Sequence, residues 1–142
     1  MAAGPTVKKI MDTYKGKIRL AIKNYPYIYR DYSYLAAEAS LAARDQGKYW
    51  EMHDLLLKRS PKLDRMSLIG YAKELGLDVK EFTDSIDSER HAQDIERDVQ
   101  LATGMDIYNT PTFFINGLKV IGDRPFADFK KIIDQELKNA KQ

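Results

Sequence analysis

The chain has 142 residues, no cysteine, and 23 basic against 21 acidic side chains, for a formal net charge of +2. Its length suits one domain, and a 44% hydrophobic and 31% charged composition is typical of a folded globular protein. The balanced charge argues against nucleic acid or a membrane surface as main partner, and the lack of cysteine excludes disulfides, thiolate metal sites and thiol nucleophiles in these residues.

The first two predicted elements are a helix and a strand. Residues 5–14 have the spacing of an amphipathic helix, with one apolar face made by Val7, Ile10, Met11 and Tyr14. Residues 17–23 alternate between apolar side chains and mainly charged ones, which predicts a β-strand. Pro26 cannot donate to a ladder, so we expect the strand to end before it.

The next predicted elements are helices, because apolar residues from Ser33 to Gly104 recur at helical spacing. Gly47 and Gly76 divide this stretch, and Asp78 with a glutamate three residues later marks another helix start. So much helix between two strand regions indicates an all-helical insertion rather than regular alternation of strands and helices.

The last predicted elements are a β-hairpin and a helix. Two short β-rich runs, 112–115 and 118–121, are separated by Asn116-Gly117, the pair that best suits a type I′ turn. The closing helix has one apolar face, made by Phe126, Phe129, Ile132, Ile133 and Leu137.

Three segments resemble the DsbA family of thioredoxin-fold proteins, in the family's order and at family-like spacing. They are Gln46-Gly-Lys-Tyr-Trp-Glu-Met-His-Asp-Leu-Leu56, Tyr71-Ala-Lys-Glu-Leu-Gly-Leu-Asp78 and Asn109-Thr-Pro-Thr-Phe-Phe-Ile-Asn-Gly117. The resemblance covers about Pro5 to Leu137. It implies an α/β (α+β) class, with a thioredoxin-like core at 1–32 and 107–142 and a helical insertion domain at 33–106.

The resemblance also implies that a first central strand and a Cys-x-x-Cys motif are missing, so that the chain is truncated at its N-terminus. In the family's topology that strand lies between 17–23 and 112–115. Its loss removes on the order of 5–10 kcal/mol of apolar burial, comparable to the net stability of a domain. We expect compensation either by direct pairing of 17–23 with 112–115 or by a homo-oligomer formed through exposed sheet edges, and we favour the oligomer.

Two groups of residues are candidate sites, and no catalytic residue is expected without the Cys-x-x-Cys. The resemblance implies that Asn109, Thr110 and Pro111 present backbone to an extended substrate peptide across a cis Thr110–Pro111 bond. The alternative is a trans proline that starts an edge strand. Tyr25, Tyr27 and Tyr29 belong to a cluster of five tyrosines that suits a peptide groove or an interface, but it also suits a loop packed over the insertion.

Other chemistry has little support in the sequence. His53 is expected to be structural and His91 to lie on a solvated helix start, and the mixed charges of 84–98 and 130–141 are expected to form solvated helix faces. No nucleotide-binding, zinc-protease or serine-hydrolase motif is present, so we expect no metal and no cofactor.

Three functions remain open at this point. The first is a DsbA-like thiol–disulfide oxidoreductase by lineage, redox-inactive in this cysteine-free form. The second is a non-catalytic module that binds a polypeptide or a second copy of itself. The third is a relative of the kappa-type glutathione transferases and isomerases, which share the helical insertion. The family suggests a periplasmic or other extracytoplasmic location, although the first residues have no features of a signal peptide and no apolar run spans a bilayer.

Overall fold

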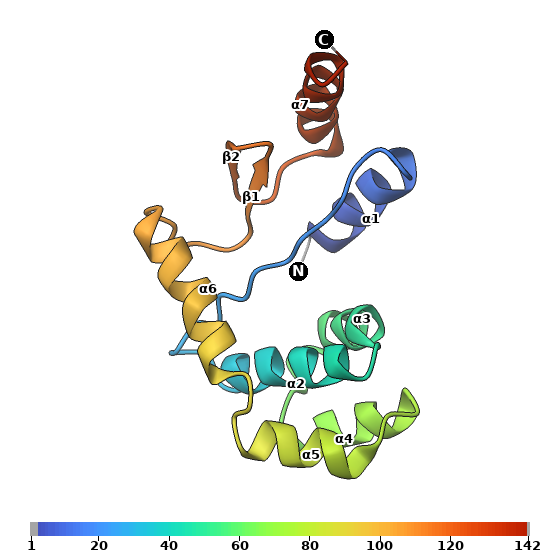
Figure 1. Cartoon of the computed structure of the whole chain (residues 1–142), viewed down its shortest axis with the longest axis vertical. Coiled ribbons are helices and arrows are strands. Elements are labelled where there is room, and N and C mark those ends of the chain that lie inside the picture. Colours follow the sequence, from blue (N-terminus) through green and yellow to red (C-terminus); the bar gives the residue numbers. More distant parts are fainter. Residues whose placement is uncertain (1–2, 142) are drawn as a thin grey trace. The chain divides into compact units, whose positions relative to one another are not determined.

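The computed structural model describes residues 3–141, which form two compact units (Figure 1). One unit contains residues 3–22 and 106–141, and the other contains residues 23–105. Each unit has apolar clusters of its own. Residues 23–32 therefore group with the helices in this division. The sequence predicts domain boundaries after residues 32 and 106 instead, and these boundaries stay a prediction.

The helical unit contains five helices, as the sequence predicts: α2 (Ser33–Asp45), α3 (Tyr49–Arg59), α4 (Arg65–Glu74), α5 (Val79–Asp87) and α6 (Ala92–Gly104). Aspartates begin two of them, because the Asp64 carboxylate accepts a hydrogen bond from the Ser67 N–H at 3.0 Å and the Asp78 carboxylate accepts one from the Glu81 N–H at 2.9 Å. These caps fix where α4 and α5 start.

The core of the helical unit is built around the small-residue face of α2. Ala39, Ala42 and Ala43 are fully buried and let neighbouring helices approach closely. The larger side chains that fill the space around them come from α3, α4, α5 and the turn after α4: Met52, Leu68, Tyr71, Leu77, Phe82 and Ile86. A smaller apolar contact, made by Ala37, Leu41 and Ile95, joins α2 to α6.

The other unit contains α1 (Ala3–Thr13), strands β1 (Thr112–Ile115) and β2 (Leu118–Ile121), and α7 (Phe126–Asn139). The strands pair antiparallel, and the turn residues Asn116 and Gly117 have φ angles of 47° and 88°, so the predicted type I′ hairpin is confirmed. One face of the hairpin packs against both helices, and the rings of Phe113 and Phe129 meet edge to face at 4.9 Å.

The strand predicted at 17–23 is wrong. Ile18, Leu20 and Ile22 are half-buried while Arg19 and Ala21 are exposed, so the side chains do alternate as in a strand. However, the only sheet within residues 3–141 is the two-stranded hairpin, and within those residues the backbone of 18–22 makes no hydrogen bond. The alternation encodes burial on one side, but a strand also needs a neighbour to pair with.

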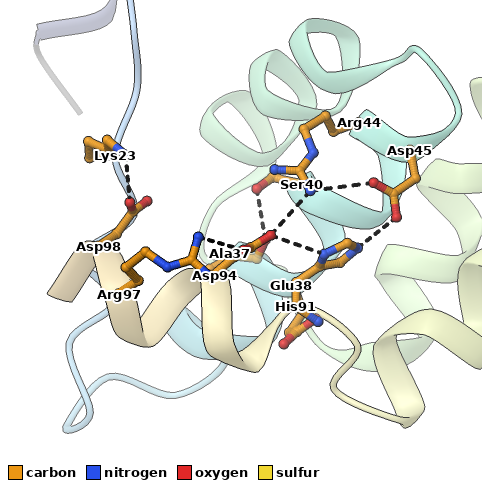
Figure 2. A network of polar contacts seen from close by, with 10 residues as sticks. All are labelled: Lys23, Ala37, Glu38, Ser40, Arg44, Asp45, His91, Asp94, Arg97 and Asp98. Carbon is orange, nitrogen blue, oxygen red and sulfur yellow. Dashed lines mark hydrogen bonds and ion pairs between the residues drawn. The ribbon is translucent and has the colours of Figure 1, made fainter. Parts of the chain in front are cut away.

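The turn that leads into α6 buries two ionisable residues, and this corrects the expectation for His91. His91 is 7% exposed rather than solvated, and Glu38 of α2 is 0% exposed. The His91 backbone N–H donates a hydrogen bond to Glu38 Oε2 at 3.1 Å, whereas Glu38 Oε1 is buried without a partner within residues 3–141. Figure 2 shows both side chains between α2 and the start of α6.

Further charged groups surround the His91 ring. Its Nε2 lies 2.8 Å from Asp45 Oδ2, an ion-pair distance without the alignment of a hydrogen bond, and its Nδ1 lies 3.7 Å from Asp94 Oδ2. Arg44 lies 3.5 Å from Asp45 and 3.4 Å from Asp94, which joins the two carboxylates on α2 and α6 (Figure 2). The contact between these helices is therefore partly electrostatic.

This burial predicts an unusual pH dependence for a Glu38→Gln variant. Burial raises the pKa of Glu38 above its ordinary 4.5, so the folded chain holds this proton more tightly than the unfolded chain. The stability that this tighter proton binding gives the folded chain is complete below pH 4.5. It is lost as the pH rises through the raised pKa of Glu38. The free energy of unfolding of E38Q minus that of the wild type should therefore increase from about pH 4 to about pH 7 in urea titrations.

Glu51→Gln is the matched control, because the pKa of Glu51 is lowered by hydrogen bonding from its own backbone N–H at the start of α3 and then from Lys48. The free energy of unfolding of E51Q minus that of the wild type should therefore decrease over the same pH range. A difference for E38Q that is constant, or that decreases as it does for E51Q, would contradict the account of Glu38.

Candidate functional site

The segment that precedes β1 holds the first group of expected site residues. Asn109 and Thr110 are exposed and Pro111 is half-buried, and the Thr110–Pro111 peptide bond is cis. The Thr112 hydroxyl donates a hydrogen bond to the Asn109 carbonyl at 2.7 Å, which holds the segment in a turn. The Gly122 N–H donates to the Pro111 carbonyl at 2.9 Å and ties the segment to the end of β2.

The pairing of the hairpin determines which backbone groups face outward. A two-residue turn makes Ile115 and Leu118 a hydrogen-bonded pair, and such pairs recur at every second residue, as the Gly122–Pro111 bond shows. Phe113 and Ile115 therefore direct their N–H and C=O groups to β2. Thr112 and Phe114 direct theirs to the opposite edge, where within residues 3–141 these backbone groups have no partner.

The face of the hairpin turned away from α1 and α7 carries apolar side chains. Register places Thr112 opposite Ile121 and Phe114 opposite Lys119, so these four share that face. Phe114 is 42% and Ile121 is 53% exposed, which is unusual for large apolar residues in a sheet. The edge of β1 and this face form one surface with unpaired backbone and exposed apolar groups.

The second group of expected residues lies in the helical unit. The rings of Tyr25 and Tyr27 meet edge to face at 5.8 Å, those of Tyr27 and Tyr29 stack at 5.1 Å, and the Arg30 guanidinium lies 5.6 Å from the centre of the Tyr27 ring. Tyr29 is 74% exposed. The three rings thus form a continuous aromatic ladder, and its use as a groove or interface stays a prediction.

Some structurally important side chains are not indicated by any motif. Tyr14 donates a hydrogen bond to Asp134 at 2.6 Å and joins the end of α1 to α7, and burial together with this carboxylate raises the pKa of Tyr14 to about 12. His53 lies beside the rings of Tyr49 and Trp50. Among residues 3–141, no group of three or more histidine, aspartate or glutamate side chains has the arrangement of a metal site.

Comparison with known proteins identifies the family. Residues 2–135 match the family model described as "Thioredoxin". The fold matches a thioredoxin-like oxidoreductase from Silicibacter pomeroyi with a TM-score of 0.84 and 27% identity, over 96% of this chain and 78% of that one. BdbD from Bacillus subtilis matches with a TM-score of 0.85 and 24% identity, over 96% of this chain and 79% of that one.

Curated relatives of similar sequence are much longer proteins. An Na⁺/H⁺ antiporter NhaA from Salinispora arenicola is 40% identical over 116 residues, which are 81% of this chain and 18% of that protein. One from Herminiimonas arsenicoxydans is 38% identical over 105 residues, 74% of this chain and 17% of that protein. The chain therefore spans less than a fifth of the length of these relatives, and among its described residues no helix is long and apolar enough to cross a membrane.

The matches agree with the geometry of the chain. Both solved structures align with nearly all of it, helical insertion included, so the α+β arrangement of one hairpin, two supporting helices and an inserted helical unit is a thioredoxin-like fold. The thioredoxin-fold resemblance of the three quoted segments is confirmed by the family model and by these neighbours. The chain belongs to the thioredoxin family.

Proposed function

We propose that this chain is a redox-inactive DsbA-like module that binds extended polypeptide at Asn109, Thr110 and Pro111. The observation that carries the proposal is a thioredoxin-like fold with an open strand edge in a chain that has no cysteine. Thiol–disulfide exchange requires a thiolate to attack a disulfide sulfur, and these 142 residues cannot provide one. Peptide binding needs no thiol.

The exposed edge supports binding of an extended chain. Peptides add to a sheet edge through main-chain hydrogen bonds, with side-chain contacts supplying specificity. Asn109 and Thr110 are exposed directly before the edge of β1, and Phe114 offers an aromatic surface beside it. The aromatic ladder of Tyr25, Tyr27 and Tyr29 is the candidate for further contacts, because tyrosine combines a large apolar ring with a polar group.

Self-association through the same edge is the second candidate function, with the exposed Phe114 and Ile121 in its favour. Unpaired strand edges template pairing between copies, and isologous pairing would give a homodimer. Sedimentation velocity at increasing concentration distinguishes the two candidates. A concentration-dependent dimer supports self-association, whereas a monomer at all concentrations leaves peptide binding as the function.

The chain should have no thiol–disulfide oxidoreductase activity. In an insulin-reduction assay with dithiothreitol, its rate should equal that of the buffer alone, because no residue can form the mixed disulfide. A cysteine-containing DsbA-like enzyme in the same assay is the positive control. Turnover above the buffer blank would overturn the redox-inactive part of the proposal.

The proposed peptide site can be mapped by NMR without changing the chain. On titration with a reduced and carboxymethylated unfolded protein, the largest amide shift changes should occur at Asn109 and Thr110, since both are exposed beside the strand edge. Changes at Tyr25, Tyr27 and Tyr29 would extend the site to the aromatic ladder. Changes restricted to the helices of residues 33–104, or none at all, would contradict the proposal.

A further inference from the structure

The charged cluster between α2 and α6 surrounds a carboxyl group that water does not reach. Glu38 is 0% exposed, and among the described residues its one hydrogen-bond donor is the His91 backbone N–H. Glu89 in the turn before α6 and Asp94 in the first turn of α6 act on the same carboxyl, and so does the Tyr34 side chain one turn earlier on α2. An ionised Glu38 is therefore a buried charge that faces two like charges, which is unfavourable.

The imidazole ring of His91 meets carboxylates from both helices. Its Nε2 lies 2.8 Å from Asp45 Oδ2 of α2, and its Nδ1 lies 3.7 Å from Asp94 Oδ2 of α6 (Figure 2). Arg44 is close to both carboxylates, and Arg97 lies 3.3 Å from Asp94. Histidine is the side chain that ordinarily changes charge between pH 5 and 8. A protonated ring adds an ion pair to each helix, so its protonation strengthens the contact between α2 and α6.

The protons on Glu38 and His91 set the charge balance of the whole cluster. With both groups protonated, three positive charges face three negative ones, and the cluster is formally neutral. With both deprotonated, two positive charges face four negative ones. The pKa of Glu38 is raised chiefly because burial disfavours its charged form. The other members counted here are Arg44, Arg97, Asp45, Glu89 and Asp94.

Helix α6 also holds one end of the loop that carries the aromatic ladder. Asp98, in the middle of α6, accepts hydrogen bonds from Lys23 Nζ and from the Asn24 N–H, both at 2.9 Å (Figure 2). At the other side of the loop, the Tyr27 N–H donates to the hydroxyl of Ser33, the first residue of α2, at 3.1 Å. Because the loop is tied to both helices, a movement of α6 on α2 would be transmitted to the ladder.

We propose that Glu38 and His91 form a proton-dependent clamp between α2 and α6 that controls the order of the aromatic ladder. With both groups protonated, the cluster is neutral, α6 is held on α2, and Asp98 keeps the ladder in one arrangement. As the protons are lost, like charges face each other at Glu38 and the ion pairs of His91 disappear, so α6 and the ladder loosen together. The clamp rests on the proposed function in one step only, namely that the ladder contacts bound polypeptide.

The test compares the free chain at pH 5 and at pH 8. Hydrogen exchange measured by NMR and corrected for intrinsic rates gives a protection factor for each amide. Protection of Ile95 and Val99 in α6 should fall about tenfold or more from pH 5 to pH 8, relative to Leu68 and Ala72 in α4. The ring protons of Tyr27, which lie against both neighbouring tyrosine rings, should move toward random-coil positions over the same range.

Four variants separate the steps of the clamp. Glu38→Gln should keep α6 protected at pH 8, because its side chain stays uncharged. His91→Gln should lower the protection of α6 already at pH 5, since it cannot gain the positive charge. Asp98→Ala should leave the pH response of α6 intact and abolish that of the Tyr27 ring. Glu51→Gln lies outside the cluster on α3 and should behave as the wild type. Urea titrations at pH 5 check that each variant folds.

The step shared with the proposed function is tested by binding of the carboxymethylated unfolded protein. Wild type and E38Q are compared at the same pH, so that effects of pH on the ligand cancel. The wild type should bind about threefold or more weakly than E38Q at pH 8 and equally at pH 5. Equal binding at pH 8 would contradict control of the ladder by the clamp.

Three further results would overturn the clamp, and the wild-type measurement decides it even where a variant does not fold. They are a protection of α6 that follows that of α4 between pH 5 and pH 8, an E38Q variant that loses protection as the wild type does, and a D98A variant whose Tyr27 ring still responds to pH. Unchanged α6 protection with normal polypeptide binding would reject the clamp and leave the proposed function intact. A pH response of α6 and Tyr27 without any binding would support the clamp and reject that function.

Discussion

In the unit of residues 3–22 and 106–141, the main physical constraint is that the N–H and C=O groups of extended backbone need hydrogen-bond partners. A two-stranded hairpin is marginal by itself, and here it is stabilised because Phe113 and Ile115 pack on α1 and α7. The same core also contacts Ile18, whose backbone makes no hydrogen bond within residues 3–141. The lack of cysteine excludes thiol chemistry in these 142 residues, and the open edge of β1 is the observation on which the proposed binding of extended polypeptide rests.

The helical unit is organised by a different constraint, the close approach that the alanines of α2 permit. That packing buries Glu38 in an otherwise apolar helix face, and the His91 backbone N–H is the only hydrogen-bond donor to it among the described residues. Arg44, Asp45 and Asp94 then link α2 to the start of α6. This charged cluster lies beside the apolar contact that Ala37, Leu41 and Ile95 make between α2 and α6. The attachment of α6 should accordingly be sensitive to pH.

Local patterns in the sequence predict the elements of this fold better than they predict its long-range pairing. Asn116-Gly117 specifies the hairpin because both turn residues need positive φ, and helical spacing specifies the five helices of the insertion. Residues 17–23 mislead because alternation reports burial on one side and says nothing about whether a partner strand exists. The burial of His91 depends on Glu38, 53 residues away, and no local pattern shows such a contact. A lone glutamate among the small residues of 36–43 was the available indication.

The central claim is that the backbone of residues 18–22 has no hydrogen-bond partner within residues 3–141, although the side chains of Ile18, Leu20 and Ile22 are half-buried. Native-state hydrogen exchange of the free chain tests it most directly. The amides of 18–22 should exchange within about tenfold of the rates of an unstructured peptide, while the amides of Ala42 and Ala43 in the middle of the buried α2 should be strongly protected. Protection of 18–22 as strong as that of α2 would show that these residues belong to a ladder, and would contradict the account.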